Sequence, residues 1–307
     1  MVTKIDLLWK KLSRKMPTFT NKSFADLTTI GCGGKVALVA YPTTILQLKQ
    51  CLKWAKRLDV RHLILGRGSN FLASDNCFEG LVVCTSKLNK IRRFATTVWC
   101  QCGANTARVA TFCAKRGLSG TEFMYCLPAT IGGAVVMNAG CFGYDTSQIV
   151  KKVWYLQEGK IKRASWLKCQ FAKRSSIFKN SNRVVVCAKL HLVRGDIKQI
   201  EWHAKQLLQT KKSTQPLGEK TFGSAFFNAS GTASKLIDNA GLKNYQIGGA
   251  KVSNIHAGFV INIDKSSSYD IYLLLRHVQQ QVFLQFGEQL TMEVQTIGFD
   301  DETNNLG

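Results

Sequence analysis

The sequence predicts a protein of mixed helices and strands that is divided into two domains. With 307 residues, the chain is long enough for two or three domains, each with a core of its own. Some stretches carry apolar residues at helical spacing, whereas others are short apolar runs bounded by glycine, which is typical of strands. The pattern changes at Asp196, where an amphipathic helix is followed by a polar linker. We therefore expect one domain over residues 1–195 and a second over 196–307.

The elements of the first domain follow from spacing and from residues that begin or end helices. Thr44 and Asn105 are suitable N-caps, and Gly117 is a suitable helix stop. Glu158 and Gly159 suit the turn of a hairpin. In chain order, we expect a helix within 1–20, a strand at 36–41, a helix after Thr44, strands at 63–65 and 81–84, a helix after Asn105, a hairpin at 153–161 and a strand at 183–193.

The second domain is predicted in the same way. Asp196 can cap a helix whose apolar face includes Ile200 and Ala204, and residues 211–221 resemble a polar linker. A Gly-Ser loop at 223–224, a short helix closed by Gly241, a strand at 259–263, a helix at 268–286 and a strand at 290–297 are expected to follow. The polar tail at 300–307 is expected to be disordered.

The most informative stretch is residues 122–144, which is apolar and rich in small side chains. It is long enough to cross a bilayer, but Pro128, the Gly132–Gly133 pair and Asn138 would break the helix that a span requires. Glycine is used where a ligand approaches the main chain closely. Two interpretations stay open from the residues alone: a buried segment against which a large, flat ligand lies, or a tight turn inside a core.

A second glycine-rich stretch, Gly66-Arg67-Gly68-Ser69-Asn70, directly follows a predicted strand. Its glycines would let successive backbone N–H groups converge on an anion, and the side chains add a hydroxyl, an amide and a permanent positive charge. The spacing is neither that of a Walker A loop nor that of a dinucleotide-binding fingerprint. The loop suits a pyrophosphate, although a plain turn explains it equally well.

The chain is strongly basic, with a net charge of +23 from 42 basic and 19 acidic residues. This charge favours anionic partners such as phosphorylated small molecules, nucleic acid or an anionic membrane surface. The basic residues are spread along the chain, and the aromatic residues do not alternate with arginine in the pattern of a base-stacking platform. We therefore expect no nucleic acid partner.

Composition also bears on the compartment and on metals. The 11 cysteines are odd in number, and most lie among apolar neighbours, as buried free thiols do. Together with a charged N-terminus that lacks a signal peptide, this indicates a reducing, cytoplasmic setting. The five histidines show no metal-ligand spacing, so we expect no metal. No uninterrupted apolar run would span a bilayer, so we expect no membrane insertion.

Seven pieces of the sequence, in a fixed order from about residue 28 to 298, carry a resemblance to a known family. They are TTIGCGGK (28–35), LGRGSNFLASD (65–75), GLSGTEFMYCLPATIGGAVVMNAGCFG (117–143), KRSSIFK (173–179), GSAFFN (223–228), SKLIDNAGLKNYQIGGAKVSNIHAGFVIN (234–262) and FGEQLTMEVQTIG (286–298). The chain resembles the flavin-dependent UDP-N-acetylenolpyruvoylglucosamine reductases of peptidoglycan synthesis, the MurB family. Its compact linkers resemble the subtype without the extra substrate-closing insertion.

The resemblance implies an α+β fold and a cofactor. Residues 1–195 would form a two-lobed FAD-binding domain of the vanillyl-alcohol-oxidase (PCMH) type, with lobes at about 20–85 and 86–195, and residues 196–307 an α+β substrate domain. The FAD pyrophosphate would lie on the 66–70 loop and the flavin against 128–140. The residues implied to bind the cofactor are Gly66, Arg67, Gly68, Ser69, Asn70, Pro128, Gly132, Gly133, Ala134, Asn138, Ala139 and Gly140.

The resemblance also implies a reaction and its catalytic residues. NADPH would reduce the FAD, which would pass a hydride to the enolpyruvyl group of UDP-N-acetylglucosamine enolpyruvate, giving UDP-N-acetylmuramate. Matched by motif, Ser224 would be the proton donor, and Arg174 and Glu293 would bind and polarise the carboxylate. The family usually has tyrosine directly before this arginine, where this chain has Lys173. We expect a monomer.

Two alternatives come from other classes of protein. The first is a flavin oxidase of the same fold, in which a histidine or cysteine tethers FAD covalently. Neither glycine-rich stretch contains a histidine, but Cys32 and Cys141 stay open as attachment points. The second is a basic nucleic-acid-binding protein, suggested by the net charge alone.

Overall fold

The computed structural model describes residues 2–228 and 230–299, and the chain divides into two compact units. Unit 1 comprises Met1–Thr20, Leu38–Arg67 and Gly80–Ser213, and unit 2 comprises Asn21–Ala37, Gly68–Glu79 and Thr214–Gly307. Each unit has a hydrophobic core of its own. The expected tail at 300–307 lies outside the described residues.

Unit 1 begins with a four-stranded sheet and two helices. The helices are α1 (Lys4–Leu12) and α3 (Ile45–Arg57), and α3 begins at Thr44, whose side chain accepts a hydrogen bond from the Gln47 N–H as predicted. The sheet has the order β1-β2-β5-β3, and its last two strands are parallel. The strands are β1 (Thr18–Phe19), β2 (Val36–Ala40), β3 (Arg61–Leu65) and β5 (Phe78–Cys84).

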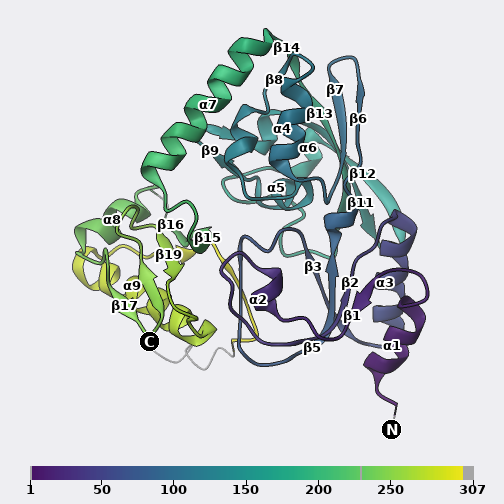
Figure 1. The fold of residues 1–307 in the computed structure, drawn as a ribbon, viewed down its shortest axis with the longest axis horizontal. Helices are drawn as coiled ribbons and strands as arrows, with labels where there is room; N and C mark the ends of the chain where they lie inside the picture. Colours follow the sequence, from purple (N-terminus) through teal and green to yellow (C-terminus); the bar gives the residue numbers. More distant parts are fainter. Residues whose placement is uncertain (1, 229, 300–307) are drawn as a thin grey trace. The chain divides into compact units, whose positions relative to one another are not determined.

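The larger sheet of unit 1 has five antiparallel strands in the order β12-β11-β13-β7-β6. They are β6 (Ile91–Phe94), β7 (Thr97–Gln101), β11 (Val150–Gln157), β12 (Lys160–Ser165) and β13 (Val184–His191). The hairpin between β11 and β12 turns at Glu158 and Gly159, both with positive φ, as the sequence predicts. One face of this sheet packs into the core with helices α4 (Thr106–Ala114) and α5 (Ile131–Met137) (Figure 1).

The predicted buried segment at 122–144 consists of short pieces. A 3₁₀ turn (Glu122–Cys126) leads through Pro128 to α5, which ends at Asn138 in the left-handed conformation, and the hairpin β9 (Gly140–Cys141) and β10 (Tyr144–Asp145) follows. Further short elements of unit 1 are 3₁₀ turns at Thr85–Lys87 and Thr146–Gln148, β8 (Leu118–Ser119), β14 (Val193–Arg194) and α6 (Trp166–Cys169). No helix among residues 2–228 and 230–299 is long and apolar enough to cross a membrane.

Helix α7 (Ile197–Thr214) is longer than predicted. It begins where Asp196 accepts a hydrogen bond from the Gln199 N–H, which confirms the expected cap. However, residues 211–213 are helical, so the expected linker at 211–221 is wrong at its start. The polar residues there continue the exposed face of the helix, and a polar composition by itself does not separate such a face from a linker.

Unit 2 contains a four-stranded sheet, order β15-β19-β18-β17, beside the helices α8 (Ala233–Asn239) and α9 (Ser268–Phe286). Helix α9 has the predicted bounds, with a capping box at Ser267 and a left-handed Gly287 after its end. The other elements are α2 (Phe24–Leu27), β4 (Phe71–Ala73), β15 (Lys220–Ser224), β16 (Phe226–Phe227), β17 (Gln246–Ile247), β18 (Ala250–Val252), β19 (Phe259–Asn262), β20 (Thr291–Met292) and β21 (Gln295–Ile297).

The division into compact units differs from the predicted domain boundary near residue 195. Helix α7 up to Ser213 belongs to unit 1, and two early segments, Asn21–Ala37 and Gly68–Glu79, belong to unit 2. The early segments join unit 2 through long-range pairing, since β21 runs parallel to β4. Compact units and functional domains are different divisions, and the assignment of functions to 1–195 and 196–307 stays a prediction.

Candidate functional site

A pocket of about 170 Å³ in unit 1 brings together one of the predicted loops and a helix N-terminus. It includes Gly66 and Arg67 from the end of β3, and Asn105 and Arg108 from the start of α4. The residues lining it are Gly66, Arg67, Ser86, Asn89, Gly103, Asn105, Arg108 and Thr130. Two arginines, hydroxyl and amide groups, and no carboxylate line this pocket, so its chemistry suits a phosphate group.

Helix α4 adds to the positive character of this pocket. Asn105 caps the helix by accepting a hydrogen bond of 3.1 Å from the Arg108 N–H. The N-terminus of a helix carries a partial positive charge and favours anions. Arg67 and Arg108 are both solvent-exposed, so their guanidinium groups are free to turn toward a bound anion without losing a buried contact.

Close packing explains two glycines of the pocket. A Cβ on Gly66 would come within 2.6 Å of the Thr130 Oγ1, and one on Gly103 would collide with the Thr85 carbonyl. The chain therefore needs glycine at both positions even without a ligand. Gly66, just after β3, lies close to Thr130, the residue that caps α5.

The Gly132–Gly133 pair in α5 contains two different glycines. Gly132 is buried, and a Cβ there would come within 2.9 Å of the Cys102 Cβ, since its N–H donates to the Cys102 carbonyl at 2.7 Å. A Cβ on Gly133 would meet only the Thr130 Oγ1, at an ordinary 3.6 Å. Packing inside unit 1 thus requires Gly132, whereas it leaves Gly133 with an open, half-buried face.

The end of α5 holds the loop that carries Arg174. The Asn138 side chain donates to the Ala172 carbonyl at 3.1 Å and accepts from the Ser147 N–H at 2.9 Å. The Arg174 guanidinium donates to the Gly140 carbonyl at 3.1 Å. The structure therefore brings Arg174 together with the predicted 138–140 segment. Asn138 is buried and both ends of its amide are used within the protein, so it positions this loop.

Arg174 lies at the strained position of its turn. Ala172 and Ser175 exchange two backbone hydrogen bonds, and between them Arg174 has a φ of 55°. A non-glycine residue in the left-handed region costs about 1–3 kcal/mol and is often found at functional sites. The Arg174 carbonyl accepts a hydrogen bond from the Lys179 side chain, which helps to hold the turn.

The remaining predicted residues of unit 1 mainly support the backbone. Ala134 is fully buried, and its carbonyl accepts the Ala139 N–H at 2.8 Å. The Ala139 carbonyl accepts from both the N–H and the hydroxyl of Thr146. Pro128 is exposed just before α5. Of these residues, Pro128 has the most accessible side chain.

Two thiols and an ammonium group lie beside this segment. The Lys211 ammonium, on α7, donates to the Cys126 carbonyl, and burial lowers the pKa of Lys211. A hydrogen bond with Cys126 raises the pKa of the Cys141 thiol, and burial adds to the rise. Cys141 is therefore a protonated thiol at neutral pH, which is a poor nucleophile.

The rest of the predicted 66–70 loop belongs to unit 2. Gly68 has a φ of 68°, and a Cβ there would collide with the Leu27 carbonyl, so glycine is needed for the fold. Asn70 donates from its side chain to the Glu293 carbonyl at 3.0 Å, and its own carbonyl accepts from the Gln295 N–H at 3.0 Å. Ser69 is half-buried next to it.

A β-bulge places Ser224. The register of β15 on β19 shifts between Thr221 and Ser224, and Gly223, within the bulge, has a φ of 86°. Nothing lies within 4 Å of a Cβ built on Gly223. Bulges redirect the side chain that follows and are common beside active sites. Ser224 is half-buried. Its hydroxyl donates to the Phe226 carbonyl at a long 3.3 Å, so this hydrogen bond is weak.

The backbone of Glu293 lies next to Ala225, the residue after Ser224, because the Glu293 N–H donates to the Ala225 carbonyl at 2.8 Å. The predicted continuous strand at 290–297 is interrupted at this point: β20 pairs with β16, and β21 pairs with β4. Leu290 and Val294 are buried, whereas Met292 and Glu293 are both half-buried. Glu293 lies between the two short strands β20 and β21.

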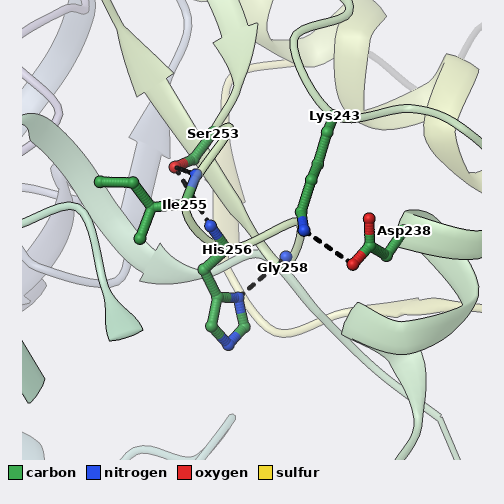
Figure 2. A network of polar contacts seen from close by, with 6 residues as sticks. All are labelled: Asp238, Lys243, Ser253, Ile255, His256 and Gly258. Carbon is green, nitrogen blue, oxygen red and sulfur yellow. Dashed lines mark hydrogen bonds and ion pairs between the residues drawn. The ribbon is translucent and has the colours of Figure 1, made fainter. Parts of the chain in front are cut away.

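His256 and Asn262 in unit 2 have structural roles. The His256 Nδ1 accepts a hydrogen bond from the Gly258 N–H, and the Ser253 hydroxyl accepts from the N–H of His256, as Figure 2 shows. Burial lowers the pKa of His256. Asn262 donates to the Ile30 carbonyl and accepts from the Ser266 N–H. Each side chain is used to hold loops of its own unit.

Comparisons with known proteins identify the family. Residues 36–165 match the family described as FAD binding domain, and residues 215–297 match the C-terminal domain of UDP-N-acetylenolpyruvoylglucosamine reductase. A reductase of that name from Synechococcus sp. is 37% identical over 90% of this chain and 90% of its own length. Another, from Caldanaerobacter subterraneus, is 33% identical over 94% of this chain and 96% of its own.

The chain belongs to the UDP-N-acetylenolpyruvoylglucosamine reductase family.

Solved structures agree with this family and with the predicted fold class. The crystal structure of the reductase MurB from Thermus caldophilus has a TM-score of 0.78 and 25% identity, and it is matched over 92% of this chain and 99% of its own. The glucose dehydrogenase Phl p 4.0202 has a TM-score of 0.50 at 14% identity, over 92% of this chain and 63% of its own, and shows a shared fold alone. The α+β, PCMH-type flavoprotein fold is confirmed.

The sequence missed several residues of the reductase pocket. Asn105 was expected only as a helix cap, and Arg108 and Thr130 lie far along the chain from Arg67. The sequence held part of the signal for this pocket, because Asn105 as a cap and Arg108 three residues later place a cation at the start of a helix. The spacing does not predict that this start lies beside the Gly66 loop.

Proposed function

We propose that this chain is an FAD- and NADPH-dependent reductase that converts UDP-N-acetylglucosamine enolpyruvate to UDP-N-acetylmuramate, in peptidoglycan precursor synthesis. The observation that carries the proposal is that one chain matches both the FAD-binding domain and the reductase C-terminal domain, and that it covers nearly the full length of reductases of this name. The basic pocket of unit 1 supports it, and so does the weakly bonded Ser224 hydroxyl of unit 2.

The residues present fit FAD. The basic pocket at Arg67 and Arg108 is smaller than a site for a whole dinucleotide, which occupies several hundred Å³, and suits the pyrophosphate part. Gly133 offers backbone without a side chain, as close approach of a flat ring requires. When bound, FAD takes a hydride from NADPH and supplies it to the β-carbon of the enolpyruvyl group.

Three side chains would carry out the remaining chemistry. Ser224 would donate a proton to the α-carbon, since its hydroxyl makes only a long hydrogen bond within the protein. Arg174 would stabilise the negative charge that develops on the carboxylate side, and its strained turn fixes the guanidinium for that task. Glu293, whose N–H donates to the Ala225 carbonyl, would hold the substrate carboxylate through its acidic form.

The other site residues keep supporting roles in this proposal. Asn138 would act by positioning the Arg174 turn, and Gly66, Gly68, Gly132 and Gly140 by allowing the backbone to pack closely. Ser69 and Asn70 would complete the pyrophosphate loop. Pro128, Gly133 and Ala139 would line the flavin, and Ala134, which is fully buried, would support the helix behind it. We further propose FAD binding within 1–195, substrate binding within 196–307, a cytoplasmic monomer, and the subtype without the extra insertion.

A covalent flavin oxidase is the weaker alternative. Cys32 is 5% exposed and burial raises its pKa to about 11, and the Cys141 thiol is likewise held protonated. A thiol that attaches to a flavin must act as a thiolate nucleophile. Neither Cys32 nor Cys141 is therefore suited to form a covalent bond to the flavin.

The visible spectrum of the purified protein tests the proposal. Anaerobic NADPH is expected to bleach the flavin absorbance, and UDP-N-acetylglucosamine enolpyruvate is expected to restore it. Ser224→Ala is expected to keep the bleaching and to slow the recovery by about a hundredfold or more, because only the second half-reaction needs the proton donor.

Ser213→Ala provides a matched control, because Ser213 is an exposed serine on the last turn of α7. This variant should behave as the wild type in both half-reactions. A protein that binds no FAD, or a Ser224→Ala variant whose flavin recovers at the wild-type rate, would contradict the cofactor and the proton-donor assignments, respectively.

A further inference from the structure

The five-stranded sheet of unit 1 is strongly basic. Strands β6, β11, β12 and β13 contain lysines or arginines, β7 contains no charged residue, and none of the five contains aspartate or glutamate. The single carboxylate nearby in the sequence is that of Glu158 in the turn after β11, which lies 3.9 Å from the Lys162 ammonium. A sheet that carries charge of one sign creates a positive potential over its exposed face.

The strand register places several of these cations in one row. Arg92 on β6 lies opposite Trp99 on β7, which lies opposite Lys189 on β13, and Lys189 lies opposite Lys152 on β11. Residues directly opposite each other point to the same side of a sheet. In the next row, Arg163 on β12 lies opposite Trp154 on β11. We call this side the outer face.

The outer face lies opposite the core. Neighbouring residues that point the other way, such as Val98, Ala188 and Leu190, are buried in the core of unit 1. On the outer face, Arg92 and Arg163 are exposed, and Lys152 and Lys189 are half-buried.

The row contains an unfavourable pair. Lys152 and Lys189 are like charges directly opposite each other, an arrangement that destabilises a sheet. An anionic partner over this face would remove that repulsion. The catalytic chemistry proposed above uses none of these residues, so it does not explain why the sheet keeps them.

An exposed apolar side chain lies on the same face. Phe94 ends β6 opposite Thr97 on β7, two residues from Arg92, and its side chain is 80% exposed. The hairpin tip beyond it is Ala95 and Thr96, and the Arg93 side chain donates to the Ala95 carbonyl at 2.8 Å. An exposed apolar residue on the same face as an arginine can enter the headgroup region of a bilayer while the cation contacts lipid phosphates.

We propose that the outer face of this sheet binds the surface of an anionic phospholipid bilayer. Arg92, Lys152, Arg163 and Lys189 would contact lipid phosphates, and Phe94 would enter the interface. Each basic residue near an anionic membrane contributes about 1 kcal/mol, so several together give measurable adsorption. This binding would be peripheral, and it is independent of the proposed reductase activity.

The aromatic residues favour a bilayer over single-stranded nucleic acid. Bases bind such sheets by stacking on open aromatic rings. Here the Trp99 and Trp154 rings pack against each other at an interplanar angle of 36° with centroids 4.5 Å apart, and the Lys189 ammonium lies over the Trp99 ring at 5.5 Å. These contacts occupy the ring faces that a base would need, whereas the charges and Phe94 need no open ring.

Co-sedimentation of the holoenzyme with lipid vesicles tests the proposal. The protein is expected to sediment with phosphatidylglycerol vesicles and to stay in solution with phosphatidylcholine vesicles. Raising the salt from about 0.05 to about 0.5 M should release it, because salt screens surface charges. The double variant Arg92→Glu/Arg163→Glu is expected to bind at least about 30-fold more weakly. Phe94→Ser is expected to weaken vesicle binding at low salt, because it removes the apolar contact while leaving the charges unchanged.

The matched control is Lys53→Glu/Lys56→Glu, which makes the same change of charge on exposed positions of α3 in the same unit. It should retain most of the vesicle binding, and flavin content and reductase turnover of every variant should equal those of the wild type. Equal binding to neutral and anionic vesicles, or equal losses in both double variants, would overturn the proposal. A single-stranded oligonucleotide that binds while vesicles do not would overturn it in favour of nucleic acid.

Discussion

At the scale of single residues, adjacent glycines in this reductase serve different ends. Gly132 is glycine because α5 packs directly on the Cys102 backbone, whereas nothing inside the protein crowds Gly133. The sequence presents the two as one pair, and only their surroundings separate a packing requirement from a surface left open for a ligand. The distinction can be tested by the same substitution at both positions.

We predict opposite effects of alanine at these two positions. Gly132→Ala forces its Cβ to 2.9 Å from the Cys102 Cβ and is expected to lower the free energy of unfolding by about 1–3 kcal/mol. Gly133→Ala is expected to leave the flavin-free protein as stable or up to about 1 kcal/mol more stable, because alanine favours a helix. It should weaken FAD binding at least tenfold.

Denaturant unfolding of the flavin-free variants and FAD titration by fluorescence measure both quantities. Each variant serves as the control of the other, since the added methyl group is the same. FAD that binds to Gly133→Ala with wild-type affinity would show that the flavin does not lie against this glycine.

At the scale of elements, interruptions of the strands shape the catalytic residues. Ser224 follows the bulge at Gly223, and Glu293 lies in the gap between β20 and β21. Regular ladders would have fixed both side chains by the strand alternation alone. In unit 2, both Ser224 and Glu293 therefore lie at strand irregularities, which are common beside active sites.

We predict that Gly223→Ala slows turnover more than it affects stability. Alanine at a φ of 86° is strained by about 1–2 kcal/mol, but its Cβ would meet nothing within 4 Å. Relief of that strain is expected to change the bulge and move Ser224, with a loss of at least tenfold in the rate at which substrate reoxidises the flavin. Reduction by NADPH should stay within a factor of two or three, as stopped-flow absorbance would show.

Gly218 offers the matched control, since its φ is 93° and nothing lies within 4 Å of a Cβ built there. Gly218→Ala carries the same kind of strain outside the bulge. If it slows flavin reoxidation as much as Gly223→Ala does, general destabilisation and not the bulge is responsible.

At the scale of the whole molecule, the chain forms two compact units, each with its own core, and the basic pocket belongs to one of them. A ligand that binds only the folded state stabilises it by mass action. FAD is therefore expected to act as a folding partner of unit 1, and the pyrophosphate should account for much of that effect.

We predict that FAD at a hundred times its dissociation constant raises the free energy of unfolding of the flavin-free protein by about 2.7 kcal/mol. Riboflavin, which lacks the pyrophosphate, is expected to give a much smaller rise at the same concentration. Arg108→Ala should weaken FAD about tenfold while leaving riboflavin binding unchanged, because only the anion contacts the pocket. Differential scanning calorimetry measures the stabilisation by FAD, the stabilisation by riboflavin and the change in both that Arg108→Ala causes.

Lys115→Ala is a suitable control, since Lys115 is an exposed cation just after α4 and does not line the pocket. If Arg108→Ala kept the wild-type ratio of FAD affinity to riboflavin affinity, the pyrophosphate would have to bind elsewhere.

The sequence by itself determined what local chemistry fixes. The bounds of α9 follow from Ser267, which caps it, and from Gly287, which ends it, because both act within one turn of the helix. The hairpin at Glu158 and Gly159 follows from its two turn residues. The fold class followed from ordered motifs. The end of α7 was misplaced because a polar composition does not separate an exposed helix face from a linker.

Only the tertiary structure decided which distant residues meet. Arg67 and Arg108 share a pocket because β3 ends where α4 begins, and no periodicity within either segment encodes that meeting. The cations and tryptophans of the outer face alternate across strands and not along them, so the sequence showed no platform pattern. Strand register and helix packing depend on long-range contacts, and therefore the whole fold sets them.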